Sequence, residues 1–536
     1  MLTILIFYMR KSLICFLSVF FVLYYLPVNA QVIFPDINVQ HYTFALRLND
    51  QNDTIQGKAA VTIKFLNDVV KFPLNLVKKN SDGTGMLVSA ISENGKNLRF
   101  EQDDDVINIY TEAKNNSVHT FTINYSGVPA DGLIISTSKF GRRTFFGDNW
   151  PNRAHNWLPC ADYPSDKATV DFFVTAPDHY QVVANGLKIE ETELPDHQKL
   201  THYREKVPIP TKVMVIGVAD FAIQQSGTVY GIPVYSYVFP ENKEAGFKSY
   251  SYAPEILKYY IDKFGPYAYE KLANVQSKTI YGGMENAGAI FYTQDSIGVK
   301  WDEELLAHEI AHQWFGDAIT EKSWKNLWLS EGFATYITNC YLEHKYGPDT
   351  LKKRMVAERK LVLNLERHRF TPVVDSAVTN NFKQLLNHNS YEKGAWALHM
   401  LRRKLGDSVF WRGIRAYYAK YEDKNDNTAD FEHVMEKTSG QDLSQFFKQW
   451  LYTAGNPHLS IVWKYDADKK SVDINITQKQ NTLFVFPLQY AVDGKLYSVD
   501  IKDRETNVSI PATAKPATVK IDPDVNLLAG FDVKEE

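Results

Sequence analysis

The stretch DEELLAHEIAHQWFG, residues 302–316, constrains the chain more than any other. Its apolar residues recur at intervals of three and four, which predicts a helix. Residues four apart share one helix face, so His308 and His312 would point two imidazoles at one place, with Glu309 beside them. This pattern is typical of a zinc site in which the glutamate handles a proton. Two structural histidines beside a solvent-facing glutamate are the alternative.

A third zinc ligand is expected in the next helical segment. A catalytic zinc needs a third protein ligand and one open position for water. The segment NLWLSEGFATY contains Glu331, a single carboxylate among apolar residues, and a charge in such surroundings is costly unless it is offset. A helix hairpin through GDAITEKSWK would carry Glu331 back to the two histidines. Taken alone, Glu331 could instead be an acid favoured by the helix dipole.

The residue pattern changes twice along the 536 residues, a length that predicts more than one domain. Short alternating runs over residues 31–238 predict an N-terminal antiparallel β domain. Residues 239–454 carry helical repeats that often end at glycine, which predicts a mainly helical domain. Residues 455–536 return to alternation and predict a small C-terminal β-sandwich. We therefore expect an α+β multidomain protein with no large helical C-terminal domain.

The first thirty residues have the layout of a secretory signal peptide. A basic pair precedes a charge-free run over residues 12–26, and PVNA follows, so cleavage is expected after Ala30. Met9 competes with Met1 as the start, because an apolar stretch before the basic pair is unusual. The run is short for a membrane span, so we expect no stable membrane anchor after signal removal and a secreted or periplasmic location.

The motifs occur in an order that resembles the zinc aminopeptidases of the aminopeptidase N and leukotriene-hydrolase family. The H-E-x-x-H motif is followed by Glu331 within the sequence W-L-x-E-G-F-A, as in that family. YGGMENAG (281–288) matches the family's G-x-M-E-N signature, HNSYEKGAWALHMLR (388–402) its tyrosine helix, and WLYTAGNP (450–457) its junction into the β-sandwich. The resemblance covers most of residues 31–536. It implies a thermolysin-like catalytic domain.

The resemblance also implies how the chemistry is divided among residues. His308, His312 and Glu331 would hold one Zn2+. Glu309 would take a proton from the attacking water and pass it to the leaving amine. Tyr391 would donate a hydrogen bond to the oxyanion. Apart from the motif, Tyr391 is one of 31 tyrosines, and a packed aromatic is its alternative interpretation.

The G-x-M-E-N match implies an exopeptidase. Glu285 would pair with the free α-ammonium of a peptide, so that the first peptide bond reaches the metal. Gly282 and Gly283 would let the substrate backbone approach as an added strand, and Met284 would line the first side-chain pocket. If the resemblance to the family is set aside, the sequence YGGMEN predicts only a turn.

One position departs from the family pattern. The family has Glu or Gln ten residues before a cysteine, and counting back from Cys160 reaches Trp150. An indole cannot accept an ionic hydrogen bond. Asp148 is the expected substitute for amine binding; Asn149 is an alternative, as is Glu285 acting with an aromatic face through a cation–π contact.

Together these residues predict a secreted or periplasmic zinc aminopeptidase that acts on peptides with a free N-terminus. A zinc endopeptidase, an epoxide hydrolase on the same site and a non-catalytic binding protein are the alternatives. A net charge of −4 gives no reason to expect nucleic acid as a partner. The sequence neither predicts nor excludes a homo-oligomer. Two cysteines in the mature chain, Cys160 and Cys340, are too few for a disulfide scaffold.

Overall fold

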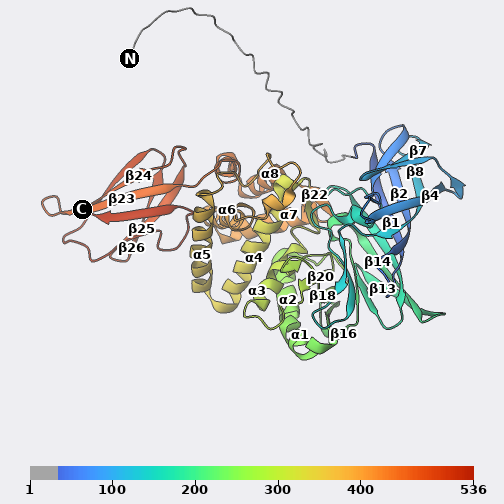
Figure 1. The fold of residues 1–536 in the computed structure, drawn as a ribbon. Coiled ribbons are helices and arrows are strands. Elements are labelled where there is room, and N and C mark those ends of the chain that lie inside the picture. Colours follow the sequence, from blue (N-terminus) through green and yellow to red (C-terminus); the bar gives the residue numbers. More distant parts are fainter. Residues whose placement is uncertain (1–33) are drawn as a thin grey trace, which may run out of the picture.

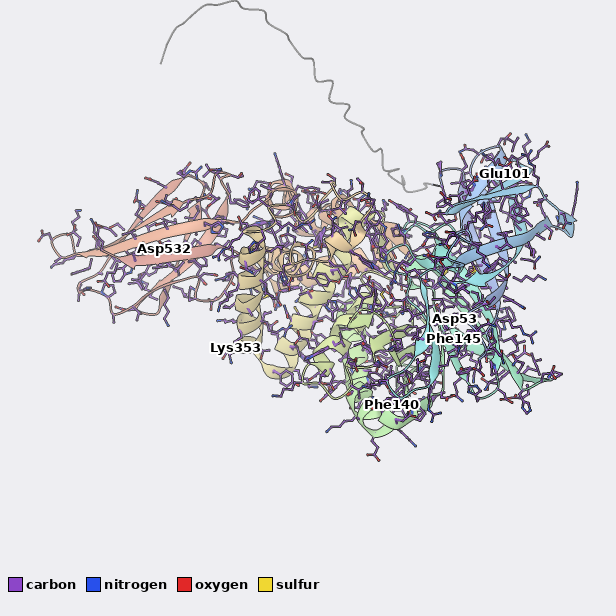
Figure 2. The ribbon with its side chains drawn as sticks, viewed as in Figure 1. Asp53, Glu101, Phe140, Phe145, Lys353 and Asp532 are labelled. Carbon is purple, nitrogen blue, oxygen red and sulfur yellow. The ribbon has the colours of Figure 1, made fainter. Side chains whose placement is uncertain are left out.

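The structure, a computed structural model, describes residues 34–536, so the expected signal peptide lies outside the described residues. Three parts follow one another along an elongated molecule: a β-rich part, a mainly helical part and a β-sandwich (Figure 1). Glu101 lies on the first part, Lys353 on the second and Asp532 on the third (Figure 2). The predicted α+β multidomain fold is therefore confirmed. No helix within residues 34–536 is long and apolar enough to cross a membrane.

The β-rich part is built around an eight-stranded sheet with the order β13-β14-β11-β1-β2-β8-β4-β5. Its strands alternate buried and exposed residues, as the sequence predicted. The sheet departs from the predicted antiparallel arrangement at one pair of strands, since β1 and β11 are parallel. The elements of this part are β1 (Ile37–Arg47), β2 (Ile55–Phe65), β3 (Val69–Asn75), β4 (Gly85–Glu93), β5 (Lys96–Asn97), β6 (Phe100–Asp103), β7 (Val106–Ala113), β8 (Val118–Val128), β9 (Leu133–Thr137), β10 (Arg143–Gly147), η1 (Ala154–Asn156), β11 (Lys167–Pro177), β12 (Gln181–Ala184), β13 (Leu187–Leu194), β14 (Gln198–Pro210), η2 (Thr211–Val213) and β15 (Ile216–Ala219).

The middle part combines helices with a five-stranded mixed sheet of order β16-β17-β18-β20-β19. This sheet continues across residue 239, since β17 pairs in parallel with β18. Its strands are β16 (Ala222–Val229), β17 (Ile232–Val238), β18 (Leu272–Ser277), β19 (Gly283–Met284) and β20 (Ala289–Thr293), and the pair β21 (Ile319–Glu321) and β22 (Lys424–Asp426) lies apart from it. The helices are η3 (Pro240–Asn242), α1 (Lys243–Ser249), η4 (Tyr250–Tyr252), α2 (Ala253–Phe264), α3 (Asp302–His312), η5 (Trp324–Asn326), α4 (Trp328–Tyr346), α5 (Pro348–Glu366), η6 (Phe382–Leu385), η7 (Asn389–Lys393), α6 (Gly394–Leu405), α7 (Asp407–Tyr421), α8 (Thr428–Ser439), α9 (Ser444–Phe447) and η8 (Lys448–Tyr452).

Helix α4 is the central helix of this part and packs against α3, α5, α6 and η7. Its contact with α6 depends on two glycines. A Cβ on Gly332 would lie 2.8 Å from the Cα of Gly394, so any larger residue at either position would push the helices apart. Glu331 directly precedes the first glycine, and the π-helix η7 directly precedes the second. The close crossing therefore brings η7 next to the carboxylate of Glu331.

The C-terminal part is a sandwich of a four-stranded sheet, β27-β24-β23-β29, and a three-stranded sheet, β26-β25-β28. It is fixed to the helical part by buried polar contacts. His399 Nε2 lies 2.9 Å from the carbonyl of Val525, and Arg359 forms an ion pair with Asp522. Its strands are β23 (His458–Asp466), β24 (Ser471–Gln478), β25 (Phe486–Val492), β26 (Lys495–Ile501), β27 (Glu505–Pro511), β28 (Val519–Ile521) and β29 (Gly530–Glu535).

Candidate active site

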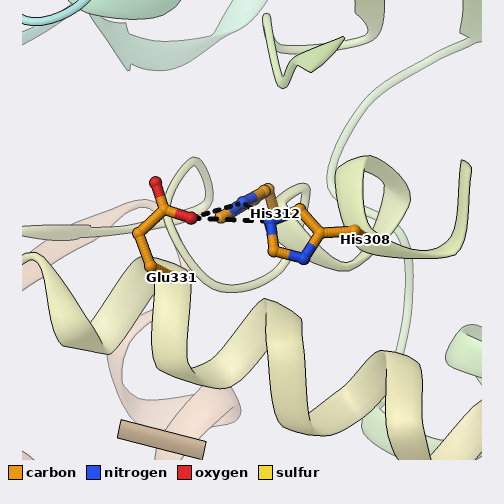
Figure 3. A group of neighbouring side chains, drawn as sticks. All are labelled: His308, His312 and Glu331. Atoms are coloured by element: carbon orange, nitrogen blue, oxygen red, sulfur yellow. Dashed lines mark hydrogen bonds and ion pairs between the residues drawn. The ribbon is translucent and has the colours of Figure 1, made fainter. Parts of the chain in front are cut away.

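Two histidines and a glutamate converge between α3 and α4. The Nε2 atoms of His308 and His312 lie 3.1 Å apart, and Glu331 Oε2 lies 3.5 Å from the first and 3.3 Å from the second (Figure 3). Tetrahedral zinc with bonds of about 2.1 Å separates its ligands by about 3.4 Å. Glu331 Oε2 is buried and has no hydrogen-bond partner within residues 34–536. The donor types and their spacing fit a zinc ion.

The far side of His312 is held by its own loop. Its Nδ1 lies 3.2 Å from the carbonyl of Phe315 and 3.0 Å from the hydroxyl of Ser330. Donation from Nδ1–H to that carbonyl leaves the Nε2 lone pair free to bind a metal. The turn that brings Phe315 back requires Gly316, whose φ is +129°. The sequence HQWFG thus completes the support of the second imidazole.

Glu309 lies on the same helix and faces the cleft beside Gly283. A Cβ on that glycine would collide with the carboxylate, so only glycine allows the two segments to approach this closely. Burial raises the pKa of Glu309 well above its ordinary value, although the charge of His312 acts in the opposite direction. A carboxylate with a raised pKa holds a proton more readily.

Tyr391 reaches the cleft from the π-helix η7, and its ring stacks 6.1 Å from that of His308. Single π-turns of this kind occur often at functional sites. Burial raises the pKa of Tyr391 well above its ordinary value, and the charge of Glu331 raises it further. The phenol therefore keeps its proton and can donate a hydrogen bond.

The segment YGGME forms the opposite wall of a cavity of about 270 Å³. Glu285 is 6% exposed, and its backbone carbonyl accepts a hydrogen bond from Gln313 Nε2 at 2.7 Å. The Oε1 atom of the same Gln313 accepts from the backbone N–H of Gly288 at 2.8 Å. Gln313, which follows the second histidine directly, was missed by sequence reasoning. It ties the metal-binding helix to the segment that carries Glu285.

Nine of the ten predicted site residues line this one cavity: Gly282, Gly283, Met284, Glu285, His308, Glu309, His312, Glu331 and Tyr391. Asp148 does not. Its side chain is fully buried, with Oδ1 paired to Arg153 and Oδ2 accepting from Thr279 Oγ1 and Ile280 N–H, each at 3.0 Å. Because these contacts occupy both oxygens, Asp148 is not available to a substrate amine and instead supports the chain that leads into YGGME.

Trp150 itself lines the cavity, where the family pattern has an acid or amide. Its ring packs edge-on against Tyr281 at 5.8 Å and against Trp324 at 5.4 Å. The indole N–H is buried without a partner among the described residues. At the position of the family's acid or amide, the wall is therefore aromatic, and the carboxylate that lies near Glu285 is that of Glu309.

Comparison with known proteins agrees with this geometry. The Peptidase M1 N-terminal domain matches residues 38–213, and the Peptidase family M1 domain matches residues 249–450. The chain belongs to peptidase family M1. This confirms the resemblance to the zinc aminopeptidases, and the family is zinc-dependent.

Relatives of this M1 chain include proteins named as aminopeptidases. It is 25% identical to "Probable aminopeptidase 2" of Sulfurisphaera tokodaii, over 91% of this chain and 63% of the relative. It is 28% identical to human glutamyl aminopeptidase, over 68% and 39%. Its fold matches Legionella pneumophila aminopeptidase A, solved in complex with aspartic acid, with a TM-score of 0.81 and 18% identity over 94% and 60% of the two chains. The chain thus spans about three fifths of the length of the first and third of these proteins and less of the second.

Proposed function

We propose that this M1 family member is an exported zinc aminopeptidase that hydrolyses the first peptide bond of peptides with a free N-terminus. The observation that carries the proposal is that Glu285 and the group His308, His312 and Glu331 line one cavity. An acid close to the metal-binding group can fix a substrate amine. The first peptide bond then lies at the metal-binding group.

His308, His312 and Glu331 would hold one Zn2+, which when bound polarises the scissile carbonyl and lowers the pKa of a water molecule to about 7. Glu309 takes the proton of that water as its oxygen attacks the carbonyl carbon. The same carboxyl then returns the proton to the nitrogen of the leaving amine. Its place in the same cavity as His308, His312 and Glu331 supports this role.

Tyr391 acts on the other side of the reacting carbonyl. As the carbonyl oxygen gains charge, the phenol donates a hydrogen bond to it. The donor costs little to arrange because η7 and the stacked ring of His308 hold Tyr391 in place before substrate arrives. Tyr391 therefore stabilises the charge that develops, while Glu309 moves the proton.

Glu285 makes the enzyme an exopeptidase. Its carboxylate pairs with the α-ammonium, which an internal residue of a peptide does not have. Gly282 and Gly283 leave room for the substrate backbone, and Met284 lines the space for the first side chain. With Trp150 beside it, the ammonium is held by one acid and an aromatic wall.

A panel of fluorogenic aminoacyl amides, each assayed with a free and an N-acetylated amine, tests the proposal. We expect hydrolysis of the free amines only, loss of activity with a chelator and recovery with zinc. An endopeptidase would cleave acetylated peptides as well. Equal rates on free and acetylated substrates would exclude the exopeptidase assignment.

A further inference from the structure

A second cavity, of about 450 Å³, lies beside the first. The two cavities share Leu305, His308 and Tyr391. The YGGME wall lines only the first cavity, and α5 lines only the second. A peptide held by its ammonium at Glu285 therefore directs the residue after the scissile bond into the second cavity.

Three carboxylates line the second cavity, and two of them are already paired. Glu304 accepts two hydrogen bonds from the guanidinium of Arg354, at 2.8 and 2.5 Å. Glu392 lies 2.8 Å from Nδ1 of His388. The third carboxylate, Glu358 on α5, has no cation paired with it among the described residues.

Glu358 is 7% exposed, and only one of its oxygens is used. Its Oε1 accepts from Asn339 Nδ2 at 2.7 Å, while Oε2 is buried without a hydrogen-bond partner in residues 34–536. Thr338, the residue before Asn339, lines the same cavity. Burial raises the pKa of Glu358 to about 8, although Asn339 and Arg354 act against this. A carboxyl so poorly solvated gains strongly from an arriving cation.

We propose that Glu358 selects peptides whose second residue is lysine or arginine, by pairing with that residue's cationic side chain in the second cavity. This inference rests on the aminopeptidase function proposed above. The apolar stem of such a side chain has suitable neighbours in Trp301, Leu305, Ala357 and Leu361, which also line the cavity. The lining thus combines apolar side chains with the carboxylate of Glu358, while the guanidinium of Arg354, which lines the same cavity, is held by Glu304.

Two tripeptides test this selection. Both carry the first residue that the enzyme cleaves fastest and a C-terminal alanine, and the second residue is either lysine or Nε-acetyl-lysine. We expect kcat/KM to be at least about tenfold higher for lysine, a ratio that corresponds to about 1.4 kcal/mol. Glu358→Gln should bring the ratio to within twofold of one. Equal kcat/KM values for the two peptides with the unmodified enzyme would overturn the proposal without any variant.

Asp349→Asn is the matched control, because it removes an exposed acid from the same helix and should keep the ratio. An aminoacyl amide with no second residue reports the proposed function separately. If the aminoacyl amide is cleaved while the two tripeptides are cleaved equally, only the selection by Glu358 is wrong.

If the aminoacyl amide is not cleaved, calorimetry on the zinc-loaded protein with uncleavable hydroxyethylene forms of both tripeptides tests the second cavity. Tenfold tighter binding of the lysine form supports the second cavity, and equal binding overturns it.

Discussion

The two walls of the first cavity are assembled in different ways. The metal-binding wall comes from α3 and α4, where a spacing of four residues and one helix hairpin bring the donors together. The amine-facing wall joins β19 to Trp150 of the N-terminal part, and Asp148 fixes that junction by contacts with Thr279 and Ile280. In the proposed function, the reaction chemistry thus depends on short-range spacing, whereas substrate selection depends on contacts between distant segments.

The metal-binding wall should be the more sensitive of the two. Glu309→Gln keeps the shape of the side chain but removes its ability to accept a proton, so we expect kcat to fall by about 10²- to 10⁴-fold. Zinc content, measured by elemental analysis, should stay at one per chain, because the proposed ligands are His308, His312 and Glu331. A variant that retains more than a tenth of the kcat would contradict the assigned role.

The amine-facing wall should govern selection more than turnover. Glu285→Ala removes the one carboxylate proposed to pair with the ammonium, and we expect kcat/KM on free-amine substrates to fall by about 10²-fold. The preference for free over acetylated amines should disappear with it. Asp349→Asn, which removes an exposed acid that lines neither cavity, serves as the control. If Glu285→Ala kept the preference, another group would have to bind the amine.

A contact outside both walls should affect stability instead of selection. His399 is buried, and desolvation, with Arg403 adding to it, lowers its pKa to about 3. Because the folded pKa lies below the unfolded value of about 6.5, the unfolded state binds the proton first, and stability is lost as pH falls below 6.5. At pH 5 the loss amounts to about 2 kcal/mol. Denaturant unfolding at pH 7.5 and pH 5 should give a smaller difference for His399→Gln than for the parent chain. An unchanged difference would assign the pH dependence to other groups.

The smallest effect is expected at the indole of the amine-facing wall. Trp150 supplies an aromatic face, and its N–H has no partner among the described residues. Trp150→Phe should therefore change kcat/KM by no more than about threefold, since a phenyl ring keeps a face for cation–π contact. A tenfold loss in steady-state assays would mean that the N–H contacts the substrate.

The same difference between the walls explains what the sequence could predict. Alternation and helical spacing reveal the β-rich, helical and sandwich parts, and the HEIAH helix reveals the metal-binding wall. The sheet across residue 239 escaped prediction, because β18 is buried on both faces and shows no alternation. The ion pair between Arg153 and Asp148 and the unpaired oxygen of Glu358 could not be predicted from the sequence, since both depend on tertiary packing.

Mass spectrometry of an unblocked decapeptide, sampled through the reaction, tests most directly the claim that Glu285 presents the first peptide bond to the metal-binding group. The structure predicts a ladder of products, each shorter by one residue from the N-terminus, with no internal fragments at early times. The same decapeptide with an acetylated N-terminus should stay intact. Early internal fragments, or cleavage of the acetylated peptide at a similar rate, would contradict the account.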